Sequence, residues 1–300
     1  MAQSLKKLTT ADIRTMYQTR DPITMITAYD ASQAALVQAA GIDVILVGDS
    51  LGMVMLGYDT TIPVTVDDMV HHAKAVRRGA PDTMMIVDMP FLSYHQAVFD
   101  TVRQAGVIMQ QAQADAVKLE GGVKIAQHVS ALVDAGIPVC GHLGLTPQSV
   151  LNFGGFYVQA KEQETAEKLL EDARAIEQAG AFMIVLECIP SQLAKIVSQV
   201  LNIPTIGIGA GSGCAGQVLV YHDVLGLNSG KRPKFVKQYA NLQAPIIDAI
   251  KTYRDEVKGQ AFPTPEFSYD ISHRALSALE EKVEASELAP VDHDPLDEER

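Results

Sequence analysis

Long apolar runs are missing from this 300-residue chain. No stretch approaches the roughly 20 residues that a membrane-spanning helix needs, and Met1 to Lys7 lack the apolar core of a signal peptide. We therefore expect a cytoplasmic protein with no membrane partner. Hydrophobic residues still make up 47% of the chain, which is enough for a sizeable core.

Cysteine is also scarce. Cys140, Cys188 and Cys214 are far apart, odd in number and without metal-ligand spacing, so we expect buried free thiols.

The sequence has no basic stripe with interleaved aromatic residues, which argues against a nucleic-acid partner. The net charge is −12, and residues 270–300 contribute ten acidic against three basic side chains. The acidity is therefore largely a property of the C-terminal tail.

Eight short apolar segments recur along the chain, and most are followed by a helical pattern. The expected strands are 23–28, 43–48, 83–87, 115–119, 137–142, 181–186, 205–208 and 218–221, and the last expected barrel helix is 234–257. Near-continuous apolar runs are typical of parallel strands covered on both faces. The pattern predicts an α/β fold, a (β/α)₈ TIM barrel over 1–263, with an open doubly wound sheet as the alternative. Residues 264–300 are expected to be an acidic, partly disordered extension with one short helix over 272–285.

Carboxylates stand at the ends of three neighbouring strands: Asp49, Asp88 and Glu120. Active sites of such barrels lie at the carboxyl ends of the strands. Three adjacent carboxylates repel one another unless a cation sits among them, and an all-oxygen set suits magnesium. Helix capping or a salt bridge is the structural alternative for each of them.

Three further polar residues end strands. Lys118 lies two positions before Glu120 and so points to the same face, either as a partner of the carboxylates or as a contact for a substrate carboxylate. Glu187 ends the sixth strand, across the barrel; a partly shielded carboxylate has a raised pKa and suits a general base, with capping of the helix after Pro190 as the alternative. His142 ends the fifth strand and is expected to be a core histidine.

The segment 207–213 is rich in glycine. Its spacing matches neither common phosphate-binding pattern, and bending of the backbone at a barrel rim explains it equally well.

Several long strings together resemble the ketopantoate hydroxymethyltransferase family, over roughly residues 5–268. They are Val47-Gly48-Asp49-Ser50-Leu51-Gly52, Gly57-Tyr58-Asp59-Thr60-Thr61, Arg77-Arg78-Gly79-Ala80-Pro81, Val117-Lys118-Leu119-Glu120-Gly121-Gly122, Gly141-His142-Leu143-Gly144-Leu145-Thr146-Pro147-Gln148 and Leu186-Glu187-Cys188. The resemblance implies a barrel of the phosphoenolpyruvate/pyruvate superfamily that uses Mg²⁺. Such an enzyme moves a hydroxymethyl group from 5,10-methylenetetrahydrofolate to 3-methyl-2-oxobutanoate through a magnesium-stabilised enolate, giving 2-dehydropantoate for pantothenate synthesis. It also implies a homo-oligomer, a decamer.

The resemblance also implies roles for individual residues. Asp49, Asp88 and Glu120 match the metal site, the last through water; Asp49, Ser50, Asp88 and Lys118 match the keto-acid contacts; and Glu187 matches the base. Tyr157, Ala160 and Ala215 depart from the family pattern in loops that we expect to shape folate access.

Two other functions compete with this one. Another magnesium-dependent 2-oxo-acid lyase or mutase of the same superfamily would use similar chemistry. In a non-catalytic binding or assembly protein, loss of the four strand-end carboxylates would affect only stability.

Overall fold

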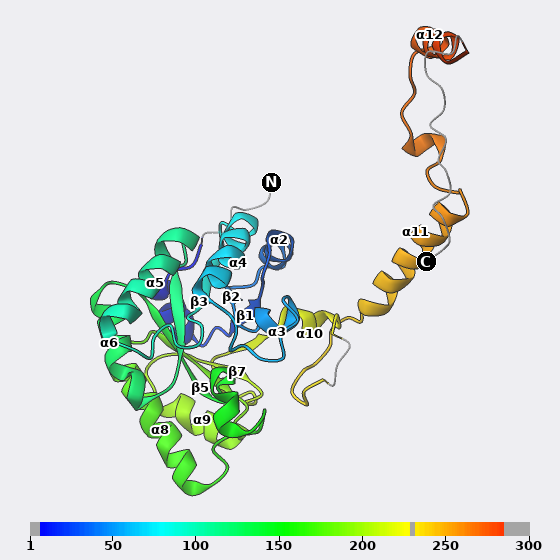
Figure 1. The fold of residues 1–300 in the computed structure, drawn as a ribbon. Helices are drawn as coiled ribbons and strands as arrows, with labels where there is room; N and C mark the ends of the chain where they lie inside the picture. The colour runs from blue at the N-terminus through cyan, green and yellow to red at the C-terminus, as the bar shows by residue number, and fades with distance from the viewer. Residues whose placement is uncertain (1–6, 229–231, 285–300) are drawn as a thin grey trace, which may run out of the picture. The chain divides into compact units, whose positions relative to one another are not determined.

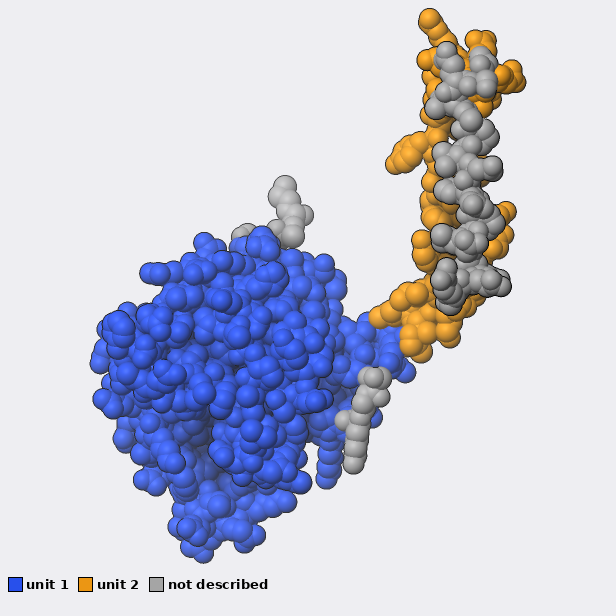
Figure 2. Space-filling model, viewed as in Figure 1, with its two compact units in different colours: residues 1–243 blue, residues 244–300 orange. Residues whose placement is uncertain are grey.

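The structure is a computed structural model that describes residues 7–228 and 232–284. The chain divides into two compact units, residues 1–243 and 244–300 (Figure 2). This boundary precedes the one expected at 263, and the domain assignment stays a prediction. The disorder expected near the C-terminus falls partly on residues 285–300, which lie outside the described residues.

Eight parallel strands close into a barrel in the first unit (Figure 1). They are β1 (Ile23–Thr27), β2 (Val44–Val47), β3 (Met84–Asp88), β4 (Ala116–Glu120), β5 (Val139–Gly144), β6 (Met183–Glu187), β7 (Thr205–Ile208) and β8 (Gly216–Leu219). Met25 of β1 pairs with Val44 of β2 on one side and with Val218 of β8 on the other. This closure confirms the predicted barrel and excludes the open sheet.

Helices surround the barrel and continue into the second unit. The α-helices are α1 (Thr10–Thr19), α2 (Ala31–Ala39), α3 (Leu51–Val54), α4 (Val66–Gly79), α5 (Val98–Ala112), α6 (Ala126–Asp134), α7 (Val150–Phe153), α8 (Gln163–Gln178), α9 (Ser191–Val200), α10 (Tyr221–Leu225), α11 (Gln243–Lys258) and α12 (His273–Glu284). The 3₁₀ turns are η1 (Val123–Ile125), η2 (Pro147–Ser149) and η3 (Pro265–Phe267). In the part of the chain that the structure describes, no helix combines the length and apolarity needed to cross a membrane.

Local sequence explains where α4 begins. Thr65 accepts a hydrogen bond from the backbone of Asp68, and the Asp68 side chain accepts one from the backbone of Thr65. This capping box satisfies two backbone donors that a helix start would otherwise leave unpaired.

Side chains alternate between two cores along each strand. Val44 and Leu46 of β2 belong to the buried cluster inside the barrel, whereas Ile45 and Val47 belong to the cluster between strands and helices. Successive strand residues point to opposite faces, so near-continuous apolar runs supply both cores at once. Cys140 is buried in the inner cluster, and all three cysteines are free.

The connection from β7 to β8 contains no helix. Residues 209–215 run along α9 instead: a Cβ on Gly211 would come 2.4 Å from the Cβ of Ser191, and one on Gly213 would come 2.8 Å from the Cβ of Lys195. Close packing on α9 therefore explains these glycines without a phosphate. β8 begins two residues earlier than predicted, and the predicted helix over 234–257 is α11, which begins only at Gln243.

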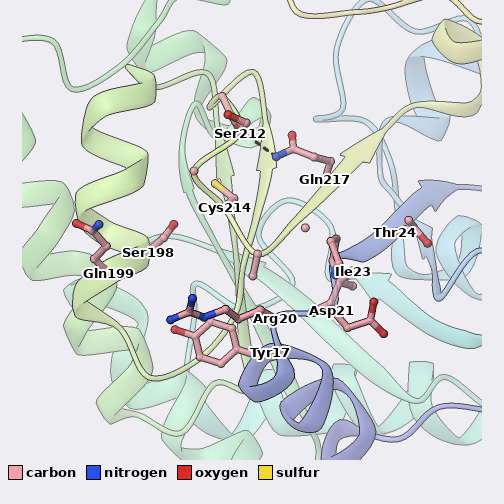
Figure 3. A pocket seen from close by; sticks show the side chains of 15 residues that line it. Tyr17, Arg20, Asp21, Ile23, Thr24, Ser198, Gln199, Ser212, Cys214 and Gln217 are labelled. Atoms are coloured by element: carbon pink, nitrogen blue, oxygen red, sulfur yellow. Dashed lines mark hydrogen bonds between the residues drawn. The ribbon is translucent and has the colours of Figure 1, made fainter.

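The amino end of the barrel is covered by α1, whose Ile13 is fully buried in the inner cluster. A cavity of about 660 Å³ lies beside this end, at the starts of β1 and β8. Figure 3 shows Tyr17 and Arg20 from the end of α1 on one side of it, and Ser198 and Gln199 from α9 on another. None of the predicted site residues lines this cavity, because it lies at the opposite end of the strands.

Candidate active site

The alternation of side chains along the strands places the predicted site residues inside the barrel. Asp88 follows the inward-facing Met84 and Ile86, and Lys118 and Glu120 follow the inward-facing Ala116 at spacings of two. The same spacing brings His142 and Glu187 inward from β5 and β6. All five residues lie at the carboxyl ends of their strands, and together with Asp49 and Ser50 they line one cavity of about 100 Å³.

Asp49 and Ser50 come from the loop that follows β2. The backbone N–H of Asp49 donates to Asp88 Oδ2 at 3.1 Å, which joins the ends of β2 and β3. Ser50 Oγ lies 2.8 Å from the hydroxyl of Tyr29, at the end of β1. Both residues are thus fixed by neighbouring strands.

Helix capping does not explain Asp49 or Glu187. The N-cap of α3 is Ser50, with no side-chain cap hydrogen bond, so Asp49 does not cap that helix. The N-cap of α9 is Pro190, likewise without one, so Glu187 does not cap it. A salt bridge does account for part of the set: Lys118 Nζ lies 3.1 Å from Asp88 Oδ1.

The charges of the site do not balance. Burial raises the pKa of Asp49 well above its usual value, and the charges of Asp88 and Glu120 raise it further. Burial likewise raises the pKa of Glu120 to about 8. Burial works against the charge of Lys118, but Asp88, Glu120 and Asp49 outweigh it and raise its pKa. One ammonium could not neutralise three ionised carboxylates, so without a cation the site favours protons on Asp49 and Glu120.

His142 lies between two of the acidic side chains. Its Nδ1 is 3.2 Å from Glu120 Oε1, and its Nε2 is 3.2 Å from Glu187 Oε2, although Nε2 is not aligned for a hydrogen bond. Burial and the nearby Lys118 ammonium lower the pKa of His142, which favours the neutral ring. The residue is buried as predicted, but it also belongs to the site.

A divalent cation fits the chemistry of this donor set. The site has an excess of buried carboxylate, and Asp88 Oδ1 accepts no hydrogen bond although Lys118 is near. Within residues 7–228 and 232–284, no three His, Cys, Asp or Glu side chains are already arranged around one ion position. Both Glu120 oxygens are engaged, by His142 and by the backbone of Gln148. The set therefore fits an ion bound directly by Asp49 and Asp88, since magnesium keeps several waters.

Two buried residues of the site escaped the sequence analysis. Tyr94 lies in the loop after β3 and Gln148 in η2 after β5, and both contact Glu120. Neither residue ends a strand, and a polar residue at a strand end was the feature that marked the other candidates in the sequence. Gln148 does close one of the strings that carry the family resemblance.

The three departures from the family pattern lie at different ends of the barrel. Gln159, between Tyr157 and Ala160, donates its backbone N–H to Cys188 O at 2.9 Å, which ties this loop to the end of β6 beside Glu187. Ala215 instead directly precedes β8 and lines the cavity at the amino end. Ala215 therefore lies away from the predicted site residues, and a role of its loop in folate access stays a prediction.

A family model described as ketopantoate hydroxymethyltransferase matches residues 7–265. The chain belongs to the ketopantoate hydroxymethyltransferase family. It is 55% identical over 271 residues to the 3-methyl-2-oxobutanoate hydroxymethyltransferase of Geobacillus thermodenitrificans, covering 90% of this chain and 97% of the relative. The enzyme of the same name from Halalkalibacterium halodurans is 53% identical, with the same coverage. Membership of this family makes the chain an enzyme of the transferase class.

Solved structures support the fold of this family member. A phosphonopyruvate hydrolase superposes with a TM-score of 0.58 at 12% identity, covering 93% of this chain and 98% of that one. A 2,3-dimethylmalate lyase, described as a member of the PEP mutase/isocitrate lyase superfamily, superposes with a TM-score of 0.51 at 16% identity, covering 92% and 97%. These likenesses show the fold that the chain shares with those proteins.

Proposed function

We propose that the chain transfers a hydroxymethyl group from 5,10-methylenetetrahydrofolate to 3-methyl-2-oxobutanoate, giving 2-dehydropantoate, the first step of pantothenate synthesis. The observation that carries the proposal is the convergence of the Asp49, Asp88, Glu120 and Lys118 side chains with that of Glu187 around one small cavity. Family membership supplies the reaction class.

The cavity suits a short branched 2-oxo acid. Its lining includes Leu46, Val185, Ile208 and Val218, which would receive an isopropyl group, together with the charged residues at the carboxyl ends of the strands. Lys118 and Ser50 would hold the substrate carboxylate and keto group, because an ammonium and a hydroxyl can donate to both. A volume of about 100 Å³ leaves the larger folate at the mouth.

The residues Asp49 and Asp88 would hold Mg²⁺ directly, and Glu120 through water. When bound, the ion supplies Lewis-acid polarisation of the keto group, which makes the C3 proton more acidic. Glu187 would remove that proton. Its side chain is 17% exposed and lies against His142 rather than a cation, so its carboxylate is not tied up in a salt bridge with Lys118. The carbon that loses the proton would then form a bond to the methylene carbon of the folate. Water supplies the hydroxyl group, the bonds from that carbon to the folate nitrogens break, and tetrahydrofolate leaves with one proton from water and the one taken from C3.

Exchange of the C3 proton of 3-methyl-2-oxobutanoate into deuterated water, followed by proton NMR, tests the metal and the base without the folate. We expect exchange that requires Mg²⁺, stops with chelator and falls by about 10²–10⁴-fold in Glu187→Gln, the contribution of a general base. Glu164→Gln, an exposed carboxylate on α8, is the matched control and should retain full exchange. Exchange that survives in Glu187→Gln or with chelator contradicts the proposal. If the wild type exchanges only after tetrahydrofolate is added, folate binds before deprotonation.

We also propose that the protein is a homo-oligomer, a decamer by family resemblance. The helix α11 buries no side chain, and Ile246, Ile250, Tyr253 and Val257 recur at the spacing of one helix face, 42–63% exposed. An apolar face of this kind is expected to be covered by another copy. Light scattering after size exclusion should give the mass of ten chains, and Ile250→Lys should reduce it; a monomeric wild type contradicts the proposal.

A further inference from the structure

One neutral side chain connects the ends of three strands beside the carboxylates. Gln148 is 5% exposed. Its Nε2 donates to Asp49 Oδ2 at 2.9 Å and to Met89 O at 2.9 Å, and its backbone N–H donates to Glu120 Oε2 at 3.1 Å. Asp49 follows β2, Met89 follows β3 and Glu120 ends β4. A single residue therefore contacts two proposed metal-site carboxylates and the backbone beside the third.

The orientation of the Gln148 amide is set by Tyr94, which is fully buried. The backbone N–H of Glu120 donates to the Tyr94 hydroxyl at 3.0 Å. A backbone N–H can only donate, so the hydroxyl accepts this bond. Its own hydrogen has two acceptors, Gln148 Oε1 at 2.8 Å and Glu120 O at 3.3 Å, and the shorter contact is the one to Gln148. With Oε1 taken by Tyr94, both hydrogens of Nε2 are left for Asp49 and Met89. The chain of bonds thus begins at the backbone of one carboxylate residue and ends at the side chain of another.

An amide also has the right charge for this place. It donates to a carboxylate without adding a second ammonium, so the negative charge that would attract a cation is retained. Holding Asp49 at Oδ2 and Glu120 at Oε2 restricts the rotation of both carboxylates. The entropic cost of ordering the two carboxylates is therefore met during folding rather than when the cation binds.

We propose that Gln148 and Tyr94 are positioning residues that align Asp49 and Glu120 for a divalent cation. The inference rests on the metal site of the proposed function. Neither residue lines the cavity, so both act through the carboxylates rather than on the substrate.

Titration of the full-length protein with Mn²⁺, with free ion measured by electron paramagnetic resonance, tests the inference apart from catalysis. Tyr94→Phe removes only the hydroxyl, and Gln148→Met removes the amide at similar length. We expect each to weaken Mn²⁺ binding by about 10–100-fold, the usual effect of losing a group that orients a ligand. At saturating Mn²⁺ the C3 exchange rate of Tyr94→Phe should recover, because the reacting groups are intact.

Tyr17→Phe is the matched control. Its hydroxyl also donates to a buried backbone, Leu201 O at 3.0 Å, but it lies at the amino end of the barrel. It should lower the unfolding temperature in chelator and leave the Mn²⁺ affinity unchanged. Loss of stability in Tyr94→Phe and Gln148→Met with Mn²⁺ affinity within twofold of the wild type overturns the inference and leaves the proposed function standing. A folded wild type that binds no Mn²⁺ overturns both the metal site and this inference.

Discussion

Lys118 Nζ lies 3.1 Å from Asp88 Oδ1, and the two side chains are 4% and 5% exposed. Both charges have left water, so each depends on the other. Asp49 and Glu120 line the same cavity, and their charges raise the pKa of the ammonium further. The Lys118 side chain therefore stays protonated, and the other residues described around the cavity supply little positive charge.

Removing this ammonium should cost stability as well as activity. In Lys118→Met the Asp88 carboxylate stays buried without its partner, and breaking a buried pair from one side costs about 3–5 kcal/mol. We expect that loss in urea unfolding with chelator. Added Mg²⁺ should restore part of it, because the ion offsets the same charge.

Lys124→Met provides the comparison, since this lysine is exposed in η1. Its free energy of unfolding should change by less than about 0.5 kcal/mol, as is usual for a surface site. Equal losses of unfolding free energy in Lys118→Met and Lys124→Met would mean that the buried Lys118–Asp88 pair contributes no more to stability than an exposed lysine.

Stability without metal should fall as the pH rises. The pKa of Glu120 is about 8 in the folded protein against a usual 4.5, so between these values the folded state holds a proton that the unfolded state has released. Folding is then favoured most at low pH, and the contribution disappears as the pH passes through about 8. Asp49 acts in the same direction.

Unfolding temperatures measured with chelator and with Mg²⁺ should therefore diverge between about pH 5 and pH 8, since the ion binds the ionised carboxylates. Glu120→Gln should make the unfolding temperature measured with chelator less dependent on pH over this range. A chelator curve that rises through it would show that Glu120 is ionised in the folded protein at low pH.

Gly144 fixes the position of Glu187 through its backbone. Its φ is +93°, and a Cβ there would lie 2.2 Å from the carbonyl oxygen of Glu187. Gly144→Ala should displace the end of β6 and reduce the C3 exchange rate by about 10²-fold, the scale expected for a displacement of about 1 Å. The measurement is the same NMR exchange assay, at saturating Mg²⁺.

Gly136→Ala separates backbone strain from displacement. Gly136 has a φ of +82°, but a Cβ added there would meet no atom within 4 Å. It should lose about 1–2 kcal/mol of stability from left-handed strain and keep its exchange rate. If Gly144→Ala and Gly136→Ala both keep the wild-type exchange rate, the backbone of Gly144 does not determine the position of Glu187.

The sequence predicted the barrel because its strands are continuous and apolar. β2, with Val44 to Val47 all buried, shows the pattern at its clearest. The start of β8 was predicted two residues late because Gly216 and Gln217 are poor strand formers. Their position is set by pairing with Ile23 and Thr24 of β1, a contact made only when the barrel closes.

The predicted site residues other than Ser50, which came from the family resemblance, were found by one rule, polar residues at or near strand ends, and the structure brings all of them around one cavity. The rule could not reach Tyr94 and Gln148, which lie in loops and meet across 54 positions of the chain. Hydrogen bonds between distant loops leave no periodic trace in a sequence. The roles of metal ligand, substrate contact and base remain predictions for the experiments above.

Ile13 at the amino end of the barrel has a kinetic consequence. With that end plugged, the deep keto-acid position and the shallower folate position share the approach from the carboxyl ends of the strands. On the proposed function, the small substrate must enter first and its product must leave last. Steady-state kinetics should then be ordered, and 2-dehydropantoate should compete with 3-methyl-2-oxobutanoate but not with the folate.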